Sequence, residues 1–148
     1  PYFYEYLPKI RLFKVDKQRT WSGKVRNAGI LNAKGDIITY LDIDDFIGIN
    51  HLQIINDNFN GYDWVYADHL MYDMKQQQFV PYHTNIDVAG MCGTSSVSHK
   101  RSLNAMWLSN NYLHDKVFID TLKAISKNYG RIPQTEYMVC HNPSGVDY

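Results

Sequence analysis

Three carboxylates stand close together where a short apolar segment ends, and they are the residues of this chain best suited to do chemistry. Asp42, Asp44 and Asp45 follow the apolar run 37–41. If that run is a strand of an open α/β sheet, the cluster lies at a carboxyl end, where such sheets bind ligands. Carboxylates this close repel one another, so a cation or hydrogen-bond donors must hold them. Hard oxygen ligands suit Mg²⁺ or Mn²⁺, and Mg²⁺ commonly joins one or two carboxylates to a substrate's phosphates. The cluster therefore indicates transfer of a group carried on a diphosphate.

The same cluster does not fit the calcium loop of an EF-hand. With Asp42 as the first position of such a loop, Ile47 stands where glycine is needed and Gln53 stands where glutamate is needed. An acidic turn in which Asp45 caps the next helix remains an alternative for the cluster taken alone.

Capping residues and hydrophobic periodicity predict the elements that must position this cluster. Ser22 is suited to cap a slim helix of small residues that runs to about Ala33, and the run 37–41 predicts a buried strand. The remaining patterns predict strands over 10–15, 64–71, 79–82, 94–98 and 132–140, and helices over 49–59, 100–108 and 115–129, the last ended by Gly130. This order favours an α/β fold with a mixed, mainly parallel sheet.

The composition limits the classes of function. The 148 residues suffice for one domain with a real core. With 15 basic and 15 acidic residues the chain has no basic field, so we expect no nucleic-acid partner. Cys92 and Cys140 lie far apart in the sequence and are interpreted as buried thiols in a reducing compartment. Without a signal peptide or a membrane-length apolar run, we expect a cytoplasmic protein, which includes a peripheral place at the cytoplasmic membrane face.

The stretch from Arg26 to Asp45, RNAGILNAKGDIITYLDIDD, resembles the core of the GT-A family 2 glycosyltransferases. Looser resemblance continues downstream, where 62–66 is similar to the family's next strand and 93–101 to its acceptor-side strand. The pair His114-Asp115 resembles the Glu-Asp pair that supplies the family's catalytic base. The resemblance covers the chain from about Ile10 onward and implies a GT-A-like, nucleotide-diphospho-sugar transferase fold.

The resemblance also implies roles for individual residues. Arg26 would lie against the nucleotide base or its phosphates, Asp42 and Asp44 would face the ribose and the metal, and Asp45 would lie beside them at the donor. Asp115 would take the proton from an acceptor hydroxyl. The implied reaction transfers a sugar, with inversion, from a nucleotide-sugar donor, most simply UDP-linked. A glycan, a lipid or another hydroxyl compound would accept the sugar, and Mg²⁺ or Mn²⁺ would assist.

Further candidates are weaker. Family members often place a histidine or arginine against the diphosphate or metal near the position of His141, for which a surface histidine is the alternative. Thr94, Ser95 and Trp107 are candidates on the acceptor side, although Trp107 is more simply a core residue than a platform for a sugar. The histidines at 51, 69, 83 and 99 have no mutual ligand spacing and are interpreted as surface or packing residues.

The chain departs from the family's pattern in two places. His114 replaces the usual glutamate, so a helix cap is an alternative role for Asp115. The family's first βαβ segment has no counterpart before Pro1. We therefore expect residues 1–148 to be a single partial catalytic domain, truncated at the amino terminus. Residues 1–60 would form its donor and metal part and 61–148 its acceptor part, and it would self-associate or form a homodimer.

Two other functions remain open. One is a noncatalytic GT-A-like fragment that binds a sugar or a partner chain without turnover. The other is a nucleotidyltransferase, which shares the logic of diphosphate and metal, but the chain lacks the glycine-rich basic loop usual in such enzymes.

Overall fold

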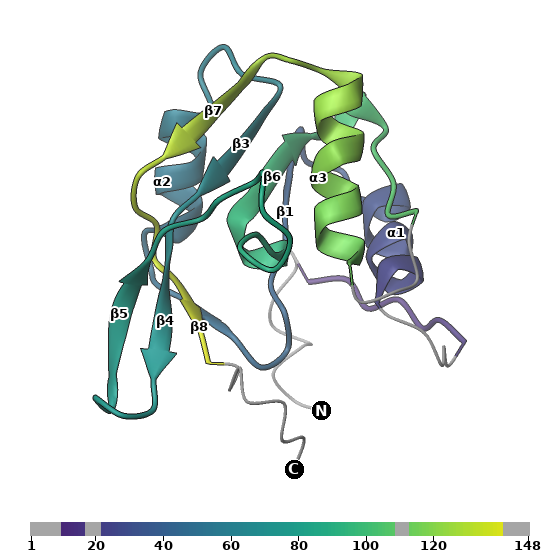
Figure 1. Ribbon diagram of the computed structural model, residues 1–148. Helices are drawn as coiled ribbons and strands as arrows, with labels where there is room; N and C mark the ends of the chain where they lie inside the picture. The colour runs from purple at the N-terminus through teal and green to yellow at the C-terminus, as the bar shows by residue number, and fades with distance from the viewer. Residues whose placement is uncertain (1–9, 17–21, 109–112, 141–148) are drawn as a thin grey trace.

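Short strands arrange the described part of the chain into two four-stranded sheets (Figure 1). The computed structural model describes residues 10–16, 22–108 and 113–140. The first sheet has the order β1-β6-β3-β7, with bounds Ile37–Thr39, Val97–Lys100, Trp64–Ala67 and Tyr129–Ile132. The second has the order β2-β8-β4-β5, with bounds Phe46–Ile47, Tyr137–Val139, His69–Asp73 and Gln78–Tyr82. The helices are α1 (Gly23–Asn32), α2 (His51–Asn58) and α3 (His114–Ile125), with 3₁₀ turns η1 (Thr94–Ser96) and η2 (Arg101–Leu103).

Both sheets are mixed, but most of their described pairings are antiparallel. Only β3 with β7 and β4 with β8 run parallel. The other four pairings are antiparallel, and one of them is the β4–β5 hairpin. A hairpin needs only a short turn, whereas parallel neighbours need a long crossover, which here contains α3 for the β3–β7 pair. The predicted α/β class with a mixed sheet is therefore confirmed, and its mainly parallel character is wrong for the described strands.

Helices cover both faces of the first sheet. Successive residues of a strand point to opposite faces, and Trp64 and Val65 of β3 are 0% and 1% exposed. Trp64 shares a core with Phe118 and Leu122 of α3, and Ile30 of α1 belongs to the same core. Val65 shares a second core with residues of α2 and β7 on the other face. Figure 1 shows α1 and α3 together on one side and α2 on the other.

Several predicted elements differ from the observed ones in type or in the residue where they end. Residues 10–16 contain no strand and are exposed. The predicted helix 100–108 is only the short η2, which ends at Asn104 in a left-handed conformation with φ 51°. The predicted helix 115–129 stops at Ile125, because Ser126 turns away to accept a hydrogen bond from Trp64 and to donate one to Asp63. Gly130 therefore does not end that helix but lies within β7.

The predicted strand 64–71 divides at Asp68, where the chain passes from the first sheet to the second. The buried Asp68 carboxylate binds Arg131 of β7 through Oδ1 at 3.2 Å and Oδ2 at 2.6 Å, and His83 approaches the same Oδ2 at 2.7 Å. These charge-assisted bonds outweigh burial, so the pKa of the Asp68 carboxyl lies below its ordinary value. A buried carboxylate with partners on two other segments, β7 and residues 83–84, fixes this joint.

The histidines that the sequence analysis interpreted as surface or packing residues are observed in these roles. His51, His69 and His99 are buried, and the His83 side chain is 77% exposed.

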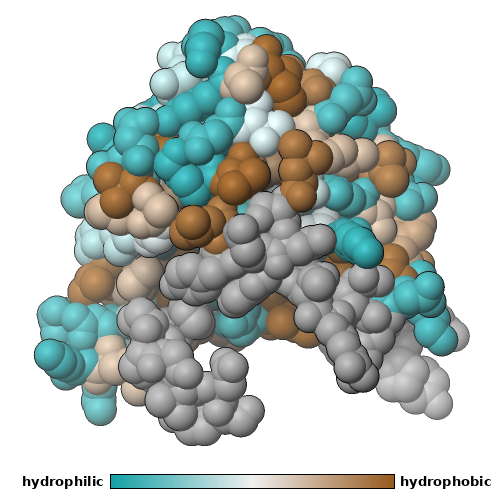
Figure 2. Space-filling model, turned by 45° about the vertical axis from the view of Figure 1, so that its right-hand side comes forward, coloured by the Kyte–Doolittle hydropathy of each residue, from teal (hydrophilic) through white to brown (hydrophobic). Residues whose placement is uncertain are grey.

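Both cysteines are free thiols. Cys92 is buried, as predicted, whereas Cys140 is partly exposed, so the prediction that both thiols are buried is wrong for Cys140. Among the described helices none is long and apolar enough to cross a membrane. Exposed apolar side chains are interspersed with polar ones on the face shown in Figure 2.

Burial of His69 predicts a loss of stability in acid. Burial lowers the pKa of His69 from 6.5 to about 4. Because the folded value lies below the unfolded one, the stabilisation is complete above about pH 6.5 and is lost as the pH falls toward 4. The substitution His69→Phe retains the stacking on Tyr82 and removes the titration. We expect the free energy of unfolding of the wild type to fall between pH 7 and pH 4 by about 3 kcal/mol more than that of the variant. Urea unfolding at both pH values measures this difference, and equal pH dependence in the two proteins would contradict it.

Candidate functional site

The acidic cluster is a tight turn between β1 and β2. The Asp45 N–H donates to the Asp42 carbonyl oxygen at 3.1 Å, which closes a four-residue turn that begins directly after Leu41. Aspartate is favoured in turns because its short side chain competes for nearby backbone donors. Asp42 is partly exposed, and Asp44 is exposed and makes no hydrogen bond or ion pair with any described residue. The cluster thus lies beyond the carboxyl end of β1, as the sequence predicts.

Asp45 is engaged inside the protein through both carboxylate oxygens. Tyr137 donates its hydroxyl to Oδ2 at 2.9 Å, and the Cys140 N–H donates to Oδ1 at 2.9 Å. Burial raises the pKa of Asp45, and the two hydrogen bonds oppose this rise. The N-cap of α2 is Asn50, so Asp45 does not cap that helix. Asp45 anchors the turn, because each of its two carboxylate oxygens accepts one hydrogen bond from β8 or the residue after it.

Arg26 of α1 reaches the turn from the side of the first core. Its Nη2 lies 2.9 Å from Oδ1 of Asp42, and its guanidinium lies 4.6 Å from the ring centroid of Trp107. Nη1 is buried and has no hydrogen-bond partner among the described residues. The neighbouring Asn27 holds Trp107 by two backbone bonds, of 2.8 and 3.0 Å. An unpartnered N–H of a buried guanidinium is costly, so this atom favours an anionic or carbonyl partner.

Trp107 serves packing in the described structure. It is 5% exposed, and the ring of Phe118 stacks on it at 4.0 Å between centroids with a 7° interplanar angle. The Arg26 guanidinium covers the ring as well. Trp107 therefore supports Arg26 and offers no open face to a sugar, which corrects its assignment as an acceptor platform.

Asp115 lies in the first turn of α3 and faces the same group of residues. Its side chain is 27% exposed, and Oδ1 lies 3.4 Å from both Thr94 Oγ1 and His114 Nδ1. Burial raises the pKa of Asp115 and the Asp42 charge adds to this, whereas the charges of His114 and Arg26 oppose it. The N-cap of α3 is Leu113, so the alternative of Asp115 as the helix cap does not hold. Asp115 is therefore a partly buried carboxylate whose raised pKa favours the protonated form more than in water.

The structure brings some of the predicted residues together and leaves others apart. Arg26 pairs with Asp42, and both lie close enough to Asp115 for their charges to shift its pKa. Thr94 lies beside Asp115, and Trp107 lies under the Arg26 guanidinium. Ser95 is half-buried in η1 without a described contact to the group. His141 lies outside the described residues. Tyr137 was missed by the sequence analysis, because nothing local distinguishes it among 12 tyrosines.

The donor set suits a cation that is shared with phosphates. The described residues contain no group of three or more histidine, cysteine, aspartate or glutamate side chains placed to hold a metal ion. Mg²⁺ is commonly bound by one or two carboxylates together with substrate phosphates, rather than by an all-protein cage. The exposed, unengaged Asp44 and the partly exposed Asp42 fit this mode, and Asp45 does not.

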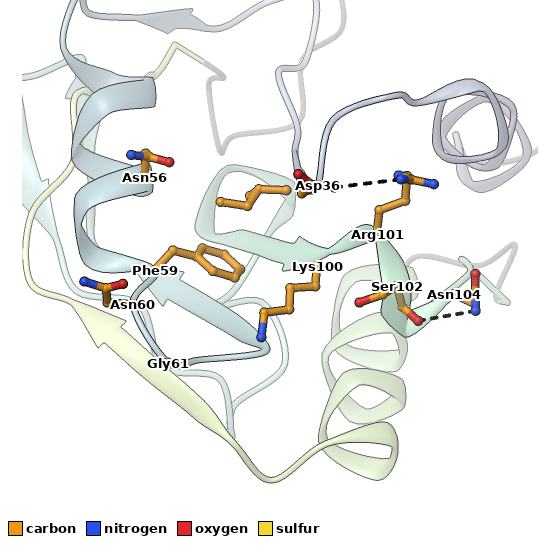
Figure 3. A pocket seen from close by; sticks show the side chains of 10 residues that line it. Asp36, Asn56, Phe59, Asn60, Gly61, Lys100, Arg101, Ser102 and Asn104 are labelled. Atoms are coloured by element: carbon orange, nitrogen blue, oxygen red, sulfur yellow. Dashed lines mark hydrogen bonds and ion pairs between the residues drawn. The ribbon is translucent and has the colours of Figure 1, made fainter.

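A pocket of about 450 Å³ lies at the opposite end of β1, and Figure 3 shows its side chains. Its lining comes from the start of β1, the end of α2 and the segment around η2. The cations there are already paired, Lys100 with Asp63 at 2.9 Å and Arg101 with Asp36 at 3.9 Å. Neither the acidic turn nor Asp115 lines this pocket. The chemistry-bearing residues therefore lie away from it.

Comparison with known proteins gives a likeness of fold. No protein-family model and no curated protein matches the chain. Among solved structures, the chain is similar to S. aureus TarS 1–349 in complex with UDP-GlcNAc, with a TM-score of 0.67 and 13% sequence identity. The match covers 93% of this chain and 45% of the TarS chain, so this chain spans less than half the length of TarS 1–349. At this identity the likeness shows the fold, which in TarS is found with a nucleotide sugar.

Proposed function

We propose that the chain acts as an inverting, metal-assisted glycosyltransferase that moves a sugar from a UDP-sugar to an acceptor hydroxyl. The observation that carries the proposal is the meeting of Arg26, Asp42 and Asp115 beyond the carboxyl end of β1. Three separate elements bring together a cation for phosphate, a carboxylate turn and a carboxylate base. The likeness to UDP-GlcNAc-bound TarS supports a nucleotide sugar as the donor.

The donor diphosphate would meet Arg26 and the acidic turn. A guanidinium binds phosphate oxygens through paired N–H groups, and the buried Nη1 of Arg26 has no described partner to lose. Asp42 holds the other side of the guanidinium at 2.9 Å and so fixes its direction. Asp44 with Asp42 would hold Mg²⁺ or Mn²⁺, which when bound neutralises charge on the leaving diphosphate.

Asp115 would act as the general base. The acceptor oxygen attacks the anomeric carbon, the bond from that carbon to the diphosphate oxygen breaks, and Asp115 takes the hydroxyl proton. Direct displacement from the opposite side inverts the anomeric centre. Burial raises the pKa of Asp115 toward the working range of a base. Since the ionised form is needed, turnover should fall as the pH drops through this raised value.

The acceptor would approach over η1, where Thr94 lies beside Asp115 and Ser95 is half-buried. In this proposal residues 1–60 supply the donor and metal part, and 61–148 supply the base and the acceptor side. The acceptor is a glycan, a lipid or another hydroxyl compound. Self-association remains a prediction that light scattering of the purified chain tests.

Calorimetric titration of the 148-residue chain with UDP, with and without Mn²⁺, tests the proposal, with ADP as the control nucleotide. We expect UDP to bind more tightly with Mn²⁺, and UDP-GlcNAc to release UDP slowly when water serves as the acceptor. Binding without any UDP release would favour a noncatalytic binding module. If no nucleotide binds under either condition, the proposed donor site is wrong.

A further inference from the structure

Tyr137 meets the acidic turn from the second sheet. It lies in β8, is 0% exposed, and stands opposite Ile47 of β2 in the antiparallel pair. Its hydroxyl accepts from the Asp42 N–H at 3.1 Å and donates to Oδ2 of Asp45 at 2.9 Å. One hydroxyl group therefore joins the first and the last residue of the turn.

These bonds use the capacity of the hydroxyl in both directions. A tyrosine hydroxyl has one donor, which points at Asp45, and accepting lone pairs, one of which receives the Asp42 N–H. The Asp45 N–H closes the turn on the Asp42 carbonyl, and the Cys140 N–H binds the other Asp45 oxygen. The turn is thus fixed to β8 and to the residue after it by a closed set of hydrogen bonds.

The carboxylates of Asp42 and Asp44 take no part in this set of hydrogen bonds. None of these bonds uses the carboxylate of Asp42, which points to Arg26, or that of Asp44, which is exposed. The geometry of both carboxylates therefore depends on how firmly the turn between them is held. The aromatic ring of Tyr137 contributes to packing instead, because it lies edge-on against the His51 ring with 5.7 Å between the centroids.

We propose that the Tyr137 hydroxyl is a positioning group that holds the acidic turn in the shape in which Asp42 and Asp44 receive the metal and diphosphate of the donor. This inference rests on the proposed function for the identity of the ligand. According to this inference, a residue of β8 helps to set the position of the carboxylates that bind the donor, although β8 lies far along the chain from the acidic turn.

Tyr137→Phe tests the inference, because it keeps the ring and removes only the hydroxyl. The matched control is Thr84→Val, which removes another buried hydroxyl that donates to Ala67 O at 2.7 Å, away from the acidic turn. Two quantities are measured on the 148-residue chain: amide hydrogen exchange at Asp42 and Asp45 without ligand, and the affinity for UDP with Mn²⁺. Thermal unfolding of each variant shows how far general stability changes.

In Tyr137→Phe we expect exchange at both turn amides to be about tenfold faster, and the affinity for UDP with Mn²⁺ to be about tenfold weaker. Thr84→Val should lower the melting temperature and change neither quantity. Unchanged exchange and affinity in Tyr137→Phe, or equal changes in both variants, would overturn the positioning role. If the wild type binds no UDP, the proposed function fails, and the exchange rates alone still decide whether the hydroxyl holds the turn.

Discussion

Replacing Asp115 by asparagine is expected to lower turnover by roughly 10²–10⁴-fold while leaving UDP binding nearly unchanged. The amide has the size of the carboxylate and can still accept from Thr94, but it cannot take up the acceptor's proton. Release of UDP from UDP-GlcNAc measures turnover, and calorimetry with UDP and Mn²⁺ measures binding. The loss should therefore appear in kcat with little change in donor affinity.

Asp120→Asn is a suitable control for this experiment. Asp120 lies on the same helix, pairs with Lys116 and has a 55% exposed side chain, so its replacement removes a surface carboxylate only. The control should retain wild-type turnover. If Asp115→Asn also retained it, Asp115 would be a structural residue and another group would have to serve as base.

The substitution Asp44→Ala is expected to abolish the part of UDP binding that depends on Mn²⁺ and to leave the fold intact. The carboxylate is exposed and makes no hydrogen bond or ion pair with a described residue, so its loss should cost little stability. In the proposed site it is one of only two carboxylates for the cation, so the metal loses half of its protein ligands. Calorimetry with UDP, with and without Mn²⁺, measures the effect, and thermal unfolding checks the fold.

Asp36→Ala is the matched variant for Asp44→Ala. Its side chain is 101% exposed and it lies at the opposite end of β1, on the rim of the pocket of about 450 Å³. Its removal should not change Mn²⁺-dependent binding. The opposite pattern, with binding lost in Asp36→Ala and kept in Asp44→Ala, would move the donor site to that pocket.

Local patterns predicted the elements that precede the acidic turn. The small residues of 23–32 and the apolar run 37–41 correspond to α1 and β1, although Ser22 makes no side-chain cap bond. Other predictions were wrong because hydrogen bonds to residues distant in sequence decide the local structure. The segment 126–130 reads as the end of a helix, yet bonds from Trp64 and to Asp63 turn it into the approach to β7. Sequence spacing carries no information about such partners.

The candidate site divides in the same way. The sequence of residues 26–45 indicates that Arg26, Asp42 and Asp44 belong to one site. In the structure, Arg26 Nη2 lies 2.9 Å from Oδ1 of Asp42. The role of Tyr137 arises only from the pairing of β2 with β8, which joins residues about ninety positions apart in the chain. The burial of Trp107 beneath Arg26 likewise depends on packing against α3, which its own neighbours in sequence do not reveal.

The central claim is that the donor diphosphate and its cation bind at the acidic turn, and paramagnetic broadening by Mn²⁺ tests it most directly. Amide resonances of the 148-residue chain are recorded with UDP and Mg²⁺, and then with trace Mn²⁺ in place of Mg²⁺. We predict that broadening is strongest at 42–45, extends to the backbone of Arg26 and Asp115, and is absent at Asn60 and Ser102 in the pocket at the other end of β1. Broadening centred on that pocket, or none that depends on UDP, would contradict the account.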